Sequence, residues 1–288
     1  MRDAAPSAPG DAPAIWLLAV GQTLGYAGLV YVFAALLVAW EADLGWSKTT
    51  LALGPALSIL VSAGLATWAG RLVDRGHAVA LLTGGACLGA LALVALSMVQ
   101  TPAQYLVVWA VIGVAHCACL YEVCFAFLVR RLGQAARGAI VRVTLVAGLA
   151  SSIAFPVGAG LAQAFGWRGA VLAFAAGLAF GAAPASWIAG RRLRRQAART
   201  PPPASETEAE GRAAFAAARR RPAFWLLAAA FGLIMTNHIM LVSFFIPLFM
   251  ERGASPAMAV AAAATVGPFQ VIGRLILALG EARVGSGR

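Results

Sequence analysis

Long apolar runs separated by short polar segments dominate the chain. A helix that crosses a membrane needs about 20 mostly apolar residues. Eight runs reach that length, and the prolines and glycines inside them do not exclude helices, because membrane helices tolerate both residues. The predicted spans are approximately Ile15–Trp40, Thr49–Ala69, Ala78–Met98, Ala103–Val129, Ala139–Gln163, Gly169–Ala189, Ala223–Met250 and Ala257–Leu279.

The polar segments between these runs divide the chain into four predicted parts. Residues 1–13 are rich in proline and alanine and lack the features of a signal peptide, so we expect a disordered N-terminus. Residues 14–190 are expected to form an N-terminal six-helix bundle. Residues 191–222 form a basic cytoplasmic linker, and residues 223–288 hold helices 7 and 8 of a partial C-terminal bundle.

Composition supports a membrane location. The chain is 61% hydrophobic and 11% charged, with a mean hydropathy of +0.82, whereas soluble domains carry about 25% charged residues. So much apolar surface could not be hidden inside a water-soluble fold of this size. The sequence therefore excludes a soluble globule, a disordered chain and a disulfide scaffold, and it predicts an all-α, polytopic membrane protein.

The net charge of +11 comes from short arginine clusters between apolar runs, and not from one basic face that would bind nucleic acid. With a cytoplasmic N-terminus, 19 of the 22 basic residues fall on the inner side, and only Lys48, Arg168 and Arg252 fall outside. This asymmetry predicts a multi-pass protein of the inner (plasma) membrane with its N-terminus in the cytoplasm. The lipid bilayer is an expected partner, and nucleic acid is not.

A weak internal repeat links the two sides of the linker. Trp-Leu-Leu-Ala opens the first and the seventh predicted helix, a glutamate follows 25 or 26 residues later, and a Gly-Pro pair occurs in each next helix. This organisation is typical of transporters built from two similar halves. The repeated positions are Trp16 to Ala19, Glu41 and Gly54-Pro55 in the first half, and Trp225 to Ala228, Glu251 and Gly267-Pro268 in the second.

The loop after the second predicted helix reads Gly-Arg-Leu-Val-Asp-Arg-Gly-His over residues 70–77. It resembles the cytoplasmic loop signature of the major facilitator superfamily, Gly-x-Leu-x-Asp-Arg-x-Gly, but is one residue shorter before Gly76 and ends in His77. In such a loop glycine allows a tight turn, aspartate neutralises a helix N-terminus, and arginine binds an acidic partner. The resemblance implies a gating role for Gly70, Asp74 and Arg75.

A second set of short motifs resembles bacterial major facilitator proteins of the monocarboxylate-porter-like type. The family fold has twelve helices in two bundles, whereas this sequence stops after the eighth predicted helix. We therefore expect either a fragment or a truncated product that associates with a missing C-terminal bundle or a partner subunit. The motifs are Leu44-Gly45-Trp46-Ser47, Leu120-Tyr121-Glu122, Arg130-Arg131, Gly148-Leu149-Ala150-Ser151-Ser152, Pro156 and Gly166-Trp167-Arg168.

Glu122 is the most informative single residue. It lies about eight residues from the cytoplasmic end of the fourth predicted helix, roughly 12 Å deep at 1.5 Å per residue. Acids inside a membrane normally face a cavity or a partner and often transfer protons, which makes Glu122 the proton-coupling candidate. The alternatives are a structural glutamate bonded to a neighbouring helix and a misplaced helix boundary.

Further polar residues occur at depth in helices 1, 4 and 7, which the resemblance implies to line the central cavity. For each of them an interhelical hydrogen bond is an equally good interpretation. His116 and Glu122 are six residues apart and do not share a face of one helix. The substrate-cavity candidates are Gln22, Tyr26, His116, Tyr121, Asn237 and His238.

The resemblance implies proton-coupled secondary active transport of a small organic solute by alternating access, and a monocarboxylate is one candidate for the solute. One alternative is an efflux antiporter, whose signature Gly148 and Pro156 partly resemble, although Phe155 replaces the glycine expected before the proline. The other is a non-transporting, truncated membrane protein. No enzyme motif or metal-ligand spacing is present in the sequence, so we expect no catalytic residue, no metal and no cofactor.

Overall fold

The computed structural model describes residues 12–197 and 216–284, and every regular element in these ranges is a helix, which confirms the all-α prediction. The elements run in the order α1 (Ala12–Tyr26), the π-helix η1 (Ala27–Tyr31), α2 (Val32–Leu44), α3 (Lys48–Asp74), α4 (Ala78–Leu96), α5 (Pro102–Cys119), α6 (Tyr121–Leu132), the 3₁₀-helix η2 (Gly133–Ala135), α7 (Ala136–Ala147), α8 (Ala150–Ala176), the π-helix η3 (Gly177–Ala182), α9 (Ala183–Ala197), α11 (Pro222–Glu251), α12 (Pro256–Ala264) and α13 (Val266–Val284).

Six helical stretches of the described residues are long and apolar enough to cross a membrane. One of them, Pro102–Arg195, has 94 residues and would be about 140 Å long if it were straight, far beyond a bilayer of about 30 Å. It reverses at Gly133 (φ 52°) and at Gly166 (φ 72°), backbone conformations that favour glycine. These turns divide the stretch into three passes, at the positions of the fourth, fifth and sixth apolar runs.

The reversal at Gly166 is visible in the packing on either side of it. A Cβ atom added at Gly158 would lie 3.5 Å from the ring of Phe174, sixteen residues later in the same helix α8. In a straight helix that separation would be about 24 Å. Helix α8 therefore folds back on itself.

Some predicted boundaries shift in the structure. Helix α9 continues to Ala197, so the first residues of the predicted 191–222 linker are helical rather than part of a loop. Helix α1 begins at Ala12, inside the segment expected to be disordered. Residues 216–219 near the end of the predicted linker are also helical, whereas residues 1–11 and 198–215 lie outside the described residues.

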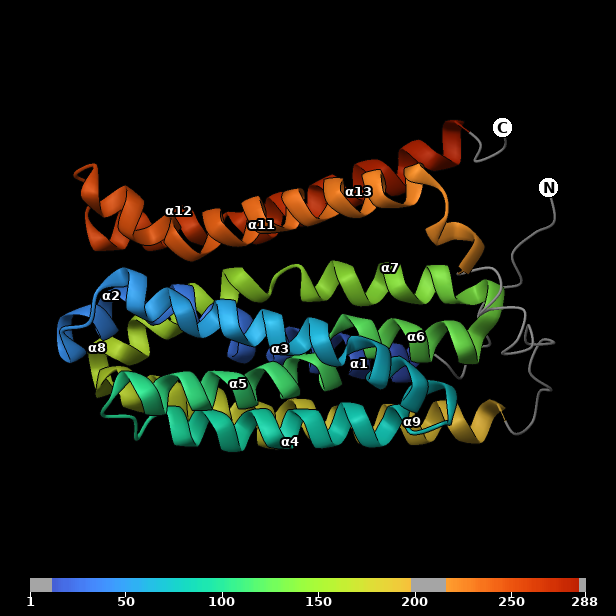
Figure 1. Ribbon diagram of the computed structural model, residues 1–288, viewed down its shortest axis with the longest axis horizontal. Coiled ribbons are helices and arrows are strands. Elements are labelled where there is room, and N and C mark those ends of the chain that lie inside the picture. Colours follow the sequence, from blue (N-terminus) through green and yellow to red (C-terminus); the bar gives the residue numbers. More distant parts are fainter. Residues whose placement is uncertain (1–11, 198–215, 285–288) are drawn as a thin grey trace.

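Figure 1 shows the arrangement of the passes, with their axes along the long dimension of the molecule. Helices α1–α9, which we call the first group, pack together below a layer formed by α11–α13, which we call the C-terminal hairpin. The hairpin packs mainly on α2 and α8. On α11 the buried residues are Val242, Ile246 and Pro247, all in its second half, so the hairpin meets the first group more closely at one end of the molecule. We call this end, which carries Lys48 and Gly253, the Lys48 end, and the opposite end, which carries Arg75 and Arg130, the basic end.

Each of the two Gly-Pro pairs of the predicted repeat leaves one helix carbonyl without its backbone donor, and in both cases a hydroxyl group from a neighbouring helix supplies the missing hydrogen bond. Proline has no N–H, so Pro55 leaves the Leu51 carbonyl without its helical donor, and Pro268 does the same to Ala264. The Tyr105 hydroxyl donates to the Leu51 carbonyl at 2.7 Å, and the Ser152 hydroxyl donates to the Ala264 carbonyl at 2.7 Å.

The glycine of each pair lets the donor's helix approach. A Cβ at Gly54 would lie 2.5 Å from Trp109 and 2.6 Å from Tyr105, and a Cβ at Gly267 would collide with Ser152. Each Gly-Pro pair is therefore a contact point for one neighbouring helix.

We expect Tyr105→Phe to lower stability by about 1–3 kcal/mol, because it leaves a buried carbonyl without a donor. In a Pro55→Ala background the restored N–H of residue 55 supplies that donor, so the same substitution should then have little effect. Thermal unfolding of the four proteins in detergent, followed by tryptophan fluorescence, measures this cycle. Equal losses in both backgrounds would show that the hydroxyl acts elsewhere.

Candidate functional site

The fourth pass is broken near its middle, although the sequence predicts one continuous helix over Ala103–Val129. Helix α5 ends at Cys119, the extended backbone of Leu120 (φ −93°, ψ −161°) interrupts the helix, and α6 begins at Tyr121. The buried side chain of Gln22 donates from Nε2 to the Cys119 carbonyl at 2.8 Å. The break puts Glu122 in the first turn of α6, where the helix dipole favours a negative charge.

An aromatic row lies beside this break. The ring centroids of Tyr26 and Tyr121 are 4.4 Å apart, and Tyr121 stacks on Phe125 at 4.6 Å. Tyr31 continues the row, 6.5 Å from Tyr26 and 5.8 Å from Phe155. Tyr26 directly precedes the π-helix η1 and Tyr31 is its last residue, and such wide turns are frequent at functional sites.

Arg274 of the C-terminal hairpin reaches this region from α13. Its guanidinium donates to the Thr144 carbonyl on α7 and lies beside the Tyr121 hydroxyl. Gly148 makes room for it, because a Cβ there would lie 2.8 Å from the Arg274 Nη1 atom. Within the described residues no ion pair joins Arg274 to a carboxylate.

Two further residues of the hairpin extend the polar region. The Gln270 amide nitrogen lies 3.4 Å from His238 Nε2, and the Tyr31 hydroxyl lies beside Gln270 and Ser151. Both the first group and the hairpin therefore contribute to one polar region within otherwise apolar helices. Its members are Tyr26, Tyr31, Tyr121, Ser151, His238, Gln270 and Arg274.

A comparison with known protein families identifies the family of this chain. The profile of the Major Facilitator Superfamily matches residues 16–288. The chain belongs to the major facilitator superfamily. Its members are secondary transporters and not enzymes, so the chain is a multi-pass membrane transporter. No curated protein and no solved structure matches it.

The transporter brings some of the predicted cavity residues together and separates others. Tyr26 and Tyr121 are in contact. Glu122 is exposed, and its charge acts on Tyr26 and on the half-buried His116. Asn237 is exposed and makes no hydrogen bond within the described residues, whereas its neighbour His238 faces α13. No group of three metal-binding side chains gathers anywhere in the described part of the chain.

Sequence reasoning missed Arg274, Gln270 and Ser151. Arg274 was counted among the charges that fix topology, but α13 continues to Val284, which places Arg274 ten residues before the helix end, about 15 Å. A signal was present, because Arg274 is the single charge inside the apolar run Ala257–Leu279, and charges inside a span usually mark a functional site. Gln270 and Ser151 gave no comparable signal.

The predicted gating loop is tied to the first group at the basic end. Asp74, the last residue of α3, lies 3.4 Å from the guanidinium of Arg130 at the end of α6. Both side chains are about half exposed, and such ion pairs contribute about 0–1 kcal/mol. Arg75 is exposed and makes no ion pair within the described residues.

The tight turn of this loop is made by Gly76, whose φ is 87°. Its carbonyl accepts a hydrogen bond from Arg194 of α9. Gly70 lies inside α3, where an added Cβ would meet open space, so the turn does not depend on it.

The structure distinguishes Gln22, which is buried and bonded to the Cys119 carbonyl, from Asn237, which is exposed and makes no hydrogen bond within the described residues. We expect Gln22→Leu to lower stability by about 1–3 kcal/mol, because the Cys119 carbonyl loses its donor. The matched control Asn237→Leu should change stability by less than about 0.5 kcal/mol, since the side chain is exposed. Thermal unfolding in detergent tests both, and similar losses for the two variants would contradict the assignment.

Proposed function

We propose that this transporter moves a small monocarboxylate together with protons. The observation that supports this proposal is the position of Arg274 inside an apolar span. A guanidinium inside an apolar span is costly unless it has a partner. Its contacts here are a neutral carbonyl and a tyrosine hydroxyl, which leave its positive charge uncompensated within the described residues. A carboxylate is the anion whose geometry a guanidinium binds best, through two parallel hydrogen bonds.

The surroundings of Arg274 favour a small solute with an apolar body. Tyr26, Tyr31 and Tyr121 offer ring faces for that body and hydroxyl groups for a polar substituent. Because the aromatic row belongs to the first group and Arg274 to the C-terminal hairpin, a bound solute would contact both. Binding between two bodies that move against each other is the basis of alternating access.

Glu122 and His116 are the groups we propose for proton coupling. Glu122 lies in the first turn of α6, next to Tyr121 of the aromatic row, and its charge acts on Tyr26 and on His116. One proton moving with one monocarboxylate transfers no net charge. Proton movement in the same direction as the anion is therefore the coupling that the site favours.

The arginine clusters suggest the orientation. Arg75, Arg130 and Arg194 lie at the basic end, and basic residues are retained on the cytoplasmic side. We propose that the basic end faces the cytoplasm and the Lys48 end the outside, in a plasma membrane.

Arg274→Gln should weaken binding of a small monocarboxylate by about 10- to 100-fold, the loss of one charge-assisted pair worth about 1.5–3 kcal/mol. Lactate, with the neutral lactamide as control ligand, is a suitable probe for binding to purified transporter. Arg274→Lys should bind with intermediate affinity, because an ammonium cannot form the double hydrogen bond. The control Arg168→Gln, at the Lys48 end, should bind like the wild type. Unchanged lactate binding by Arg274→Gln would reject a carboxylate site at this residue.

Glu122→Gln should abolish uptake driven by a proton gradient while preserving exchange of labelled for unlabelled solute across proteoliposomes. Exchange needs solute binding and alternation but no net proton movement, so the pair of assays separates proton coupling from solute binding. Proton-driven uptake equal to that of the wild type would remove Glu122 from the coupling mechanism.

A further inference from the structure

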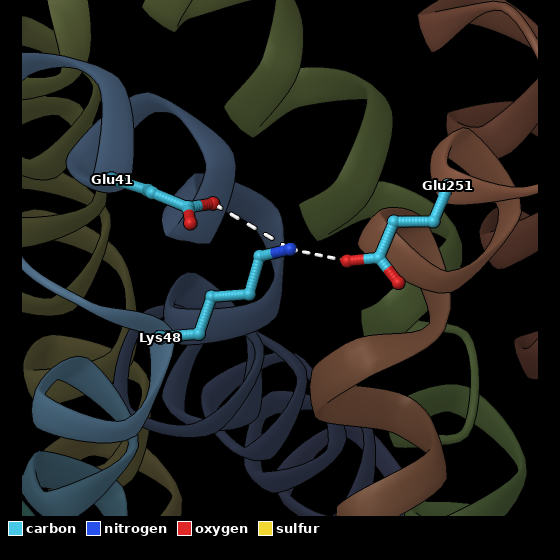
Figure 2. A network of polar contacts seen from close by, with 3 residues as sticks. All are labelled: Glu41, Lys48 and Glu251. Atoms are coloured by element: carbon cyan, nitrogen blue, oxygen red, sulfur yellow. Dashed lines mark hydrogen bonds and ion pairs between the residues drawn. The ribbon is translucent and has the colours of Figure 1, made fainter.

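A lysine at the Lys48 end lies between two glutamates. Lys48 is the first residue of α3 and the single lysine in the chain. Its Nζ atom donates to Glu251 Oε1 and lies 3.8 Å from Glu41 Oε2. Figure 2 shows the ammonium between the two carboxylates, which approach it from opposite sides.

The two glutamates belong to the two different bodies of the molecule, the first group and the C-terminal hairpin. Glu41 lies on α2, in the same first group as Lys48, whereas Glu251 is the last residue of α11 in the C-terminal hairpin. The Lys48–Glu251 pair therefore joins the two bodies across 203 residues of sequence. It lies beyond the buried α11 residues Val242 and Ile246, at the end where the bodies meet most closely.

The glutamates are also the equivalent residues of the internal repeat, since each follows the Trp-Leu-Leu-Ala sequence of its half by nearly the same interval. The lysine has no such equivalent. Ser47 and Ser255 each cap the next helix, but the residue after Ser255 is Pro256. The ammonium of Lys48 thus pairs with both glutamates that the repeat relates, and Lys48 itself lies in the first half of the chain.

We propose that Lys48 is a two-position latch that holds the Lys48 end closed through Glu251 and passes to Glu41 when that end opens. When the hairpin moves away, Glu251 leaves with it, but Glu41 stays next to Lys48 because both belong to the first group. The flexible four-carbon stem of lysine allows its ammonium to shift by the short distance required. Lys48 therefore keeps an anionic partner in both states, which lowers the cost of opening.

This latch predicts different effects for its two glutamates. Removing the charge of Glu251 weakens the closed state alone, so the Lys48 end should open more often. Removing the charge of Glu41 removes the partner of the open state, so the end should open less often. If the three charges only attracted one another and Lys48 did not change partners, both substitutions would change how often the Lys48 end opens in the same direction.

The experiment measures opening without any solute, so its result does not depend on the proposed substrate. Ile246, which is 5% exposed, is replaced by cysteine in a variant whose native cysteines are alanine. The rate of modification by a charged thiol reagent is measured in nanodiscs, which expose both ends of the protein. Glu251→Gln, Glu41→Gln and Lys48→Gln are compared in this background. The matched control is Asp43→Asn, which breaks the Asp43–Arg168 pair (2.8 Å) inside the first group at the same end.

We expect Glu251→Gln to raise the modification rate about two- to fivefold, in keeping with a partly exposed ion pair. Lys48→Gln removes the lysine's pairs in both states, so it should change the rate less than Glu251→Gln does. Glu41→Gln should lower the rate below that of the parent, and Asp43→Asn should leave it unchanged. The charge exchange Lys48→Glu with Glu251→Lys restores an ion pair between the bodies and should return the rate toward the parent value, which also excludes misfolding as the cause. The proposal is overturned if Glu251→Gln matches Asp43→Asn, or if Glu41→Gln raises the rate as Glu251→Gln does.

Discussion

Carbonyl groups inside an apolar helical bundle have no water to bond, so each carbonyl that loses its helical partner needs a donor from a neighbouring side chain. Three such carbonyls organise this transporter. Tyr105 serves Leu51, Ser152 serves Ala264, and Gln22 serves Cys119. Each bond joins two helices that are distant in sequence. The bonds of Ser152 and Gln22 lie next to the proposed site. The need to supply donors to these carbonyls therefore fixes the position of the functional residues as well as the packing of the helices.

The same breaks give the site its chemistry. The interruption at Leu120 starts a new helix at Tyr121 and so brings Tyr121 against Tyr26 and Glu122 into a first turn. Close packing of the hairpin on α7 and α8, which Gly148 and Gly267 permit, brings Arg274 to Tyr121. Solute binding and movement between the bodies are therefore linked, because the arginine and the aromatic row belong to different bodies.

Several features could be predicted from local sequence alone. The eight apolar runs have the length of a membrane pass, and the loop residues Asp74 and Arg75 stand at the end of the second run, where α3 ends. The Gly-Pro pairs were recognised as repeated positions, but their donors, Tyr105 and Ser152, could not be found, because a proline shows which carbonyl is left unbonded and not which neighbour will bond it. Gln22 and Asn237 looked alike as polar residues at depth, and only the contacts of their helices distinguish them.

The sequence by itself determined the class of this protein, the approximate positions of its membrane passes and its membership of a transporter superfamily, since these depend on run length, charge distribution and short motifs. Tertiary structure alone decided which polar residues act together. Arg274 and Tyr121 are separated by more than 150 residues, and Lys48 and Glu251 by 203. Their proximity follows from how the C-terminal hairpin packs on the first group, and that packing is the sum of many small contacts that no local pattern records.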